Sequence, residues 1–202
     1  TNLKNFTDKV FSGPFGSTLK SESYQKSGVP FIRIGDIGDL FIDKNNLVFI
    51  SPEEHKRIFS TRLDVGDIVL SKIGTIGRLS VISDELGEVN ISENNIGIRI
   101  SKLPYDKKIA LLIFLLSKYG QKQILRKASG NIQLKLNVSD IESIQVPVFS
   151  GSLLEKIVSL YNQFLKYNEQ SNIFYSQAVK LLLEEVGVKQ DVYNYEYLYN
   201  II

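Results

Sequence analysis

Residues 152–187 read SLLEKIVSLYNQFLKYNEQSNIFYSQAVKLLLEEVG, and this stretch predicts a single long helix. Ser152 and Glu155 have the S-x-x-E spacing of a capping box, which satisfies free backbone N–H groups at a helix start. Gly187 stands where a helix commonly ends on a left-handed residue. No proline interrupts the stretch, so at about 1.5 Å per residue the helix is roughly 50 Å long.

Apolar side chains along this helix follow a 4-3-4-3 spacing, which is typical of a coiled-coil seam over about four heptads. We predict that a second long helix packs on this seam. The alternative is that the helix lies on its own domain. The side chains expected to face the partner helix are Leu153, Ile157, Leu160, Phe164, Phe174, Ala178 and Leu181.

The composition is that of an ordinary folded protein, with 43% apolar and 23% charged residues in a chain of 202. Because cysteine is absent, a disulfide framework and a cysteine metal site are excluded. The longest apolar run, residues 109–116, is too short to span a bilayer. We expect a cytoplasmic protein that does not enter a membrane. The chain begins with Thr1, which leaves a fragment or a trimmed start open.

The net charge is only +2, but the charges are unevenly distributed. Residues 107–139 hold seven basic side chains and no acidic one, whereas residues 151–202 hold four basic and six acidic. A local basic field suits a polyanion such as nucleic acid. A solvated helix face is the alternative reading of the same run.

The order of predicted elements indicates an α+β domain with many short strands and few helices. Short β-strands are predicted at residues 29–34, 47–50, 63–72, 79–82, 89–92, 96–100 and 144–148. Residues 96–100 alternate, which predicts one buried face. A helix capped by Ser51, a helix or helix pair over residues 106–127 with Gly120 at its bend, and a helical turn at 139–142 complete this domain. We therefore predict a domain at 1–150, a long helix at 151–187, and a tail or linker at 188–202.

Residue patterns for catalysis are missing from the sequence. It contains no G-x-S-x-G, no Walker A motif and no glycine-rich cofactor loop followed by an Asn/Asp-Pro-Pro-aromatic segment. The single histidine, His55, has no second histidine or cysteine with which to share a metal, and we expect it at the surface. The sequence thus indicates a binding module with no catalytic residues, no metal site and no cofactor.

Four segments, in this order, resemble the specificity subunit of type I restriction–modification systems. They are SGPFGSTLK at 12–20 with GVPFIRIGD at 28–36, LDVGDIVLSKIGTIGR at 63–78, SGNIQLKLN at 129–137 with its sequel to 147, and the long helix. The resemblance implies a DNA target recognition domain followed by a conserved spacer helix. In this family two such domains are held apart by two antiparallel helices, so that a split DNA site is read.

The partners that the resemblance implies are double-stranded DNA, methyltransferase subunits and a restriction subunit. The chain has one recognition domain and one helix. It is therefore half of a longer subunit, a half-length subunit that pairs with a second copy, or the recognition region of a fused methyltransferase–endonuclease. A coiled-coil interaction protein without DNA binding is a further alternative.

Residues expected to contact DNA lie in the glycine loops, an Asn-Asn pair and the basic stretch, because glycines allow close approach and amides read adenine. These residues are Ser17, Thr18, Lys20, Lys72, Thr75, Arg78, Asn94, Asn95, Lys122, Arg126, Lys127, Asn131, Gln133 and Lys135. Alternatively, Lys72 and Arg78 are solvated loop ends and Asn94 and Asn95 are plain turn residues. Arg33 lies in a predicted strand, and a structural ion pair is as probable there as a contact with DNA.

Overall fold

The protein is described from a computed structural model, which covers residues 1–14, 19, 21–131 and 133–187. It divides into two compact units, Thr1–Phe149 and Ser150–Ile202. Each unit is described by itself. In the part of the chain that is described, no helix combines the length and apolarity that crossing a membrane requires.

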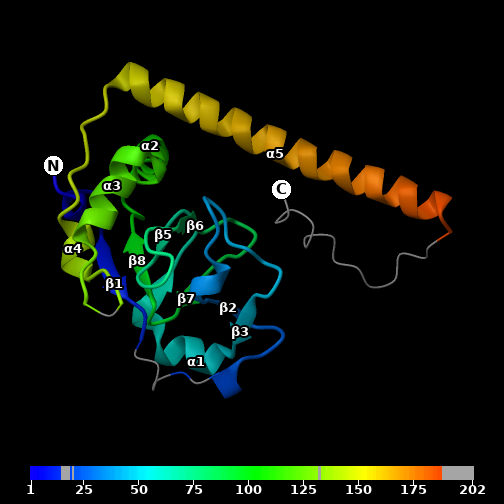
Figure 1. Ribbon diagram of the computed structural model, residues 1–202, viewed down its shortest axis with the longest axis horizontal. Coiled ribbons are helices and arrows are strands. Elements are labelled where there is room, and N and C mark those ends of the chain that lie inside the picture. Colours follow the sequence, from blue (N-terminus) through cyan, green and yellow to red (C-terminus); the bar gives the residue numbers. More distant parts are fainter. Residues whose placement is uncertain (15–18, 20, 132, 188–202) are drawn as a thin grey trace. The chain divides into compact units, whose positions relative to one another are not determined.

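The first unit contains two four-stranded sheets (Figure 1). The first sheet is antiparallel throughout, in the order β1 (Lys9–Ser12), β8 (Asn95–Arg99), β5 (Ile68–Ser71) and β6 (Leu79–Val81). The second sheet has the order β3 (Val48–Ile50), β2 (Val29–Ile32), β7 (Val89–Ile91) and β4 (Arg62–Leu63). In the second sheet β2 and β7 run parallel, while the other neighbours run antiparallel.

One apolar core joins the two sheets. It takes buried side chains from β1 and β5 of the first sheet and from β2, β4 and β7 of the second. Its members include Phe11, Ile32, Leu63, Val69, Val89 and Ile91. A smaller core of Leu19, Phe31, Ile50 and Ile58 lies where the end of helix α1 (Pro52–Arg57) meets β2 and β3.

Strand β8 corrects one prediction. The sequence predicted a strand with one buried face, but Asn95, Ile96 and Ile98 are all fully buried. Ile96 and Ile98 lie on one face, and the second sheet covers the other face, because a Cβ on Gly97 would lie 3.1 Å from the Leu63 side chain of β4.

The predicted strand at 63–72 is also divided. β4 and β5 are separated by a turn in which Gly66 has φ +85°. The Asp67 carboxylate closes this turn by accepting the backbone N–H of Asp64 at 3.0 Å. Burial raises the pKa of Asp67, and its other oxygen accepts the N–H of Ile100 at 2.8 Å. The two halves of the predicted strand therefore join different sheets.

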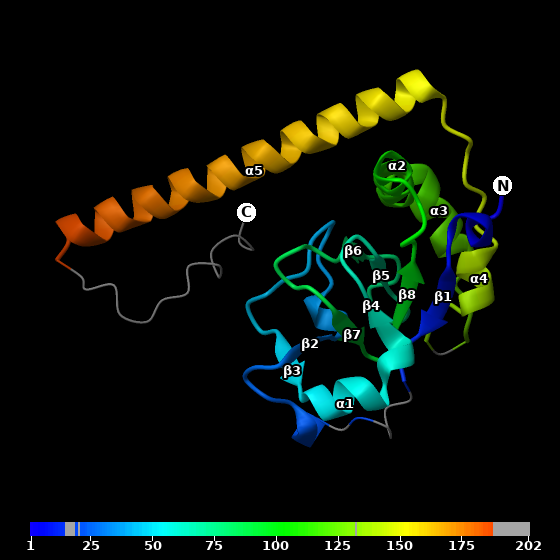
Figure 2. The same ribbon diagram turned by 180° about the vertical axis from the view of Figure 1, so that it is seen from behind.

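Helices α2 (Tyr105–Leu116), α3 (Lys118–Lys127) and α4 (Val138–Glu142) follow the last strand. Figures 1 and 2 show α3 and α4 next to β1, and α1 next to β2 and β3. The predicted helix pair is present, but its break is at Ser117, whose hydroxyl caps α3 by accepting the N–H of Gly120. Gly120 allows the two helices to approach, because a Cβ there would lie 2.3 Å from the Phe114 carbonyl oxygen.

Two further local predictions have different outcomes. The Ser51 cap of α1 is confirmed, since its hydroxyl accepts the N–H of Glu54 at 3.2 Å. The strand predicted at 144–148 is wrong, because this segment makes only an isolated bridge between Gln145 and Asn2.

The second unit contains helix α5, Gly151–Glu185. The long helix is confirmed, but its predicted capping box is wrong. The N-cap is Ser150, two residues before the predicted Ser152, and it makes no side-chain cap bond. Its predicted end is confirmed. Gly187 has φ +69° and donates its N–H to the Glu184 carbonyl oxygen. The tail predicted at 188–202 lies outside the described residues.

Candidate nucleic-acid interface

Several loops leave the first sheet at the same end. β1 ends at Ser12, which pairs with Ile96, and β5 ends at Ser71, which pairs with Asn95. Since these neighbours are antiparallel, the end of β1, the end of β5 and the start of β8 lie together. We call this edge, with residues 12–14, 72–78, 92–95, 129–131 and 133–136, the loop end.

Lys72 connects three of these segments. Its backbone N–H donates to the Asn94 carbonyl oxygen at 2.9 Å, and its own carbonyl oxygen accepts the N–H of Leu136 at 3.0 Å. Its ammonium donates to the Ser12 hydroxyl at 3.3 Å. The predicted contact residue Lys72 is thus half-buried and also acts as an internal tie within the loop end.

The glycine loop at 72–78 is closed on itself. Gly74 and Gly77 have φ +63° and +89°, which an L side chain rarely adopts. The Ser71 hydroxyl donates to the Thr75 carbonyl oxygen at 2.5 Å. This leaves Thr75 and Arg78 exposed. Arg78 Nε lies 3.5 Å from Asp39, a carboxylate that is 83% exposed, and an ion pair so open to water is weak.

Helix α3 is attached to this loop by Gln121, a residue that the sequence did not single out. Its side-chain amide donates to the carbonyl oxygens of Gly77 at 3.0 Å and Leu115 at 2.9 Å. A Cβ on Gly77 would lie 2.8 Å from the Gln121 side-chain oxygen. Nothing in the local sequence distinguishes this glutamine from a solvated one, because both acceptors are backbone atoms brought close by the fold.

Residues 129–131 and 133–135 form a short hairpin directly after α3. The N–H of Ser129 donates to the Lys135 carbonyl oxygen at 3.0 Å, and the N–H of Lys135 donates back at 2.9 Å. Lys135 also forms a bridge with Ile73 of the glycine loop. The hairpin and the glycine loop therefore form one continuous surface, and Asn131, Gln133 and Lys135 are exposed on it.

The cations of α3 and the hairpin are not neutralised by carboxylates. Lys118, Lys122 and Arg126 repeat every four residues, which places them on one face of the helix, and all three are exposed. Taking only the described residues, no carboxylate oxygen lies within 4.0 Å of these three or of Lys135. Lys127 differs, because its ammonium donates to the Ser143 hydroxyl at 2.6 Å and ties α3 to α4.

The predicted Asn-Asn pair separates into two environments. Asn95 is fully buried, and its side-chain N–H donates to the Ile32 carbonyl oxygen at 2.8 Å. The expectation that Asn95 reads bases is therefore corrected: it connects the two sheets. Asn94 is half-buried and keeps its place at the loop end. Ser17, Thr18 and Lys20 lie outside the described residues.

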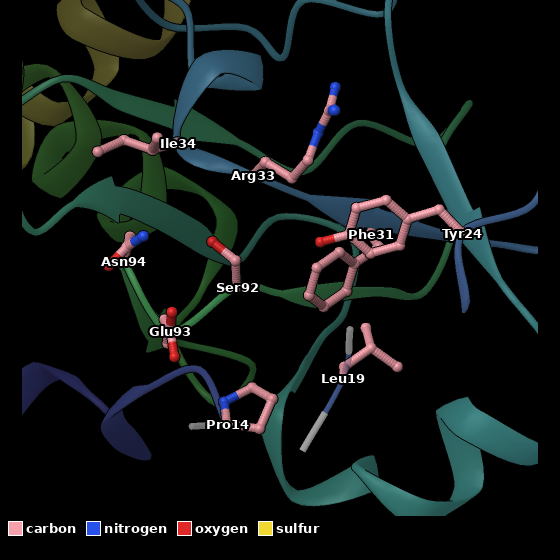
Figure 3. A pocket seen from close by; sticks show the side chains of 9 residues that line it. All are labelled: Pro14, Leu19, Tyr24, Phe31, Arg33, Ile34, Ser92, Glu93 and Asn94. Atoms are coloured by element: carbon pink, nitrogen blue, oxygen red, sulfur yellow. The ribbon is translucent and has the colours of Figure 1, made fainter. Parts of the chain in front are cut away.

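A pocket of about 150 Å³ adjoins the loop end (Figure 3). It is lined by Pro14, Leu19 and Tyr24 together with residues of the 31–34 and 92–94 segments. The rings of Tyr24 and Phe31 lie 5.6 Å apart in it, and burial raises the pKa of Tyr24. Ile34 connects the pocket to the glycine loop, because its Cδ1 would lie 3.6 Å from a Cβ on Gly74.

Arg33 forms a structural ion pair, as the alternative prediction for this residue states. Its guanidinium donates to both carboxylate oxygens of Asp36, at 2.9 and 3.1 Å, and this hydrogen bonding raises the pKa of Arg33. In Figure 3 the guanidinium extends away from Pro14 and Phe31. Arg33 therefore stabilises the turn after β2.

The expectation of a surface position for His55 is wrong. Its side chain is 11% exposed, and Nδ1 lies 2.6 Å from the Asn90 side-chain oxygen. The Asn90 amide in turn donates to the Ile58 carbonyl oxygen at 3.2 Å. His55 thus attaches α1 to β7. In the described ranges no group of three or more His, Cys, Asp or Glu side chains is arranged to hold a metal.

Comparison with known proteins identifies the family. The model of the type I restriction modification DNA specificity domain matches residues 14–178. The chain therefore belongs to this family, and it is a DNA specificity domain with an α+β fold.

The EcoBI type I restriction enzyme specificity subunit of Escherichia coli is 28% identical over 146 residues, which are 70% of this chain and 30% of that protein. The type I restriction–modification S subunit from M. genitalium has a similar fold, with TM-score 0.58 at 15% identity over 92% of this chain and 43% of that one. The type IIG restriction endonuclease BpuSI matches with TM-score 0.53 at 12% identity over 78% and 26%. The chain thus spans less than half of each of these relatives.

Proposed function

We propose that this chain binds double-stranded DNA through the loop end together with the exposed face of α3. The observation that carries the proposal is the gathering of segments that are distant in sequence. Residues 72–78, 92–94, 129–131 and 133–136 lie beside cations that have no carboxylate partner among the described residues. Unpaired cations attract phosphates, and closely approaching loops read base edges. By binding its target DNA, the chain directs a restriction–modification complex to that site.

On this proposal the chain has no catalytic residue of its own. It recognises the target, while methyltransferase and restriction subunits carry out modification and cleavage. Two relatives of the chain are specificity subunits, which supports this division of roles. The second candidate is the recognition region of a fused methylase–nuclease, which the similarity of fold to a type IIG endonuclease favours.

The salt dependence of binding tests the DNA proposal. A fluorescently labelled 30-base-pair duplex of random sequence is titrated with the full chain at several salt concentrations. Lys122→Ala with Arg126→Ala is expected to reduce the slope of log K against log[salt] by about two, one for each lost phosphate contact. Lys127 is left intact because Ser143 holds its ammonium. An unchanged slope would contradict the proposal.

We further propose that residues 1–150 form the recognition domain and that residues 151–187 form a spacer helix. The division into units at residues 149 and 150 supports these boundaries. The apolar seam of α5 supports an antiparallel partner helix, from a second copy or from the other half of a longer subunit. Leu153, Leu160, Phe174 and Leu181 of this seam are 46–67% exposed, and Ala178 is also exposed, while Ile157 is half-buried.

Sedimentation of the full chain tests the helix proposal. Leu160→Asp with Phe174→Asp is expected to shift any self-associated species to monomer, because both changes place a charge in the apolar seam. Asn168→Asp with Gln177→Asp is the matched control, since it adds the same charge at exposed polar positions of α5. Equal behaviour of the two pairs would contradict a seam-mediated contact between two copies of the chain.

A further inference from the structure

The small side chains of the α5 seam lie in its second half. The 4-3-4-3 spacing places Tyr167 and Ser171 in the seam together with the residues expected to face a partner helix. The large side chains of the seam, except the half-buried Ile157, are 43–67% exposed. Ser171 and Ala178 are exposed and small. A partner that packs well on the seam must therefore present large side chains opposite these two residues.

A second copy of α5 presents large side chains there only when it runs antiparallel. In a parallel pair equivalent positions face each other, so Ser171 would face Ser171 and Ala178 would face Ala178, which leaves cavities between large neighbours. In an antiparallel pair with its two-fold axis at Glu169, Ser171 faces Tyr167 and Ala178 faces Leu160. The remaining layers of this pair join Ile157 with Leu181 and Phe164 with Phe174.

The charges beside the seam select this register. Lys156 and Glu184 are exposed at equivalent flanking positions near opposite ends of α5, and about 40 Å of helix separates them within one chain. A two-fold axis at Glu169 places Lys156 beside Glu184 of the second copy, twice in each dimer. Glu184 also lies 3.8 Å from Lys180 of its own helix, but this pair is open to water and weak. Moving the register by one heptad either way separates Lys156 from Glu184.

We propose that the partner on the α5 seam is a second copy of this chain, antiparallel and with the two-fold axis at Glu169. This inference rests on the proposed helix pairing and DNA binding, and it commits the pairing to one partner and one register. The symmetry also defines the DNA target. Two identical recognition units related by a two-fold axis read the same half-site on opposite strands. The target is therefore an inverted repeat of one half-site.

Distances between spin labels test the register in the full chain without DNA. The sequence contains no cysteine, so Glu155→Cys and Glu169→Cys each create a single labelling site, and both remove the same charge from an exposed position of α5. The Glu169→Cys labels are expected about 20 to 30 Å apart, across the width of two helices. The Glu155→Cys labels are expected at least about 40 Å apart, because they lie near opposite ends of the pair.

Other arrangements give different distances. A parallel pair gives the same short distance at both sites, and a shift by one heptad changes the Glu155→Cys distance by about 10 Å. Either result would overturn the register. If Leu160→Asp with Phe174→Asp still abolishes the dimer, the seam contact itself stands.

A charge exchange tests the pair that selects the register. Lys156→Glu is expected to weaken self-association about fivefold, because two acidic side chains then meet twice in each dimer. Adding Glu184→Lys is expected to restore the association. The matched control is Lys156→Glu with Glu169→Lys, which has the same net charge and is expected to restore nothing, because Glu169 lies on the outer face of the pair. Equal recovery, or no recovery, in the two double variants would overturn the register.

Sedimentation and duplex selection separate this inference from the functions on which it rests. A chain that remains monomeric at the concentration used for labelling would overturn the second copy as partner. The full chain is expected to enrich inverted repeats from a pool of duplexes with a random central segment. Enrichment of one unrepeated sequence would overturn the symmetric target. Failure to enrich any duplex would instead overturn the DNA binding and would leave the label distances as they are.

Discussion

The cations of α3 and the hairpin differ from those around α1 and the second sheet. Around α1, Arg57 pairs with Glu54, and Arg62 lies 3.4 Å from Asp64 and 3.6 Å from Glu88. The α3 cations Lys118, Lys122 and Arg126 have no such neighbours among the described side chains. The cations around α1 form ion pairs within the domain, whereas the cations of α3 are exposed to solvent.

This difference shows that pairing, not the amount of charge, distinguishes a binding surface from a structural one. A net charge of +2 indicates no preference for DNA. A paired guanidinium is already neutralised locally, while an unpaired one can release counterions from DNA when it meets a phosphate. The predictions below compare the two regions directly.

The largest effect is expected from reversing the unpaired charges. Lys122→Glu with Arg126→Glu should weaken binding of a random 30-base-pair duplex on the order of 100-fold at low salt, because two attractions become repulsions. Lys44→Glu with Arg57→Glu makes the same charge change at two exposed cations that are paired with Glu85 and Glu54, and it should alter the affinity far less. Fluorescence anisotropy measures both. Equal losses would remove the distinction between the regions.

The second largest effect belongs to the structural region. Asn90 is fully buried, contacts His55 and donates to the Ile58 carbonyl oxygen. Asn90→Ala should lower the free energy of unfolding by about 2 kcal/mol, because buried polar partners lose their hydrogen bonds. Urea unfolding gives this value, and DNA affinity of the folded protein should not change. Weakened DNA binding by the folded variant would contradict the division of roles.

Gly74 and Gly87 have nearly the same φ angle, so substitutions at the two positions distinguish an effect on DNA binding from an effect on stability. Gly74 has φ +63° in the glycine loop, and Gly87 has φ +64° with open space where its Cβ would be. Alanine at either position should cost about 1 kcal/mol of unfolding free energy, since both adopt a left-handed conformation.

Only Gly74→Ala should also reduce DNA affinity, because it adds a side chain where we propose that the backbone approaches DNA. Thermal unfolding and duplex titration of the two variants test this. Equal DNA affinities would remove the glycine loop from the interface.

The smallest effect is expected at the exposed Lys44–Glu85 ion pair, whose side chains are 46% and 72% exposed. Lys44→Ala should change stability by less than about 1 kcal/mol, because water screens such pairs. It should leave DNA binding unchanged. A loss of DNA affinity comparable to that of the α3 variants would show that any exposed lysine contributes equally to DNA binding.

The sequence predicts features that depend on neighbouring residues. The Ser51 cap, the glycine that ends α5 and the helix pair after residue 104 all follow from local hydrogen-bonding and backbone preferences. Boundaries were less accurate, as at Ser117 and Gly66, because tertiary contacts decide where a turn forms.

The sequence predicts which segments form the candidate site, but not which side chains face solvent and which are structural. That residues 72–78 and 129–136 meet depends on backbone bonds between Lys72 and Leu136, which no local pattern reveals. The sequence predicts a base-reading role for Asn95 because exposed and buried asparagines look alike in a sequence, whereas Asn95 is fully buried. Gln121 was missed for the same reason, since its partners are carbonyl oxygens of other segments.

Hydrogen exchange of the full chain, with and without a random 30-base-pair duplex at low salt, tests the central claim most directly. Bound DNA should slow exchange at residues 72–78, in α3 and at residues 129–136, and it should leave α1 and β3 unchanged. Slower exchange confined to α1 and β3, with no change in the loop end, would contradict the proposed interface.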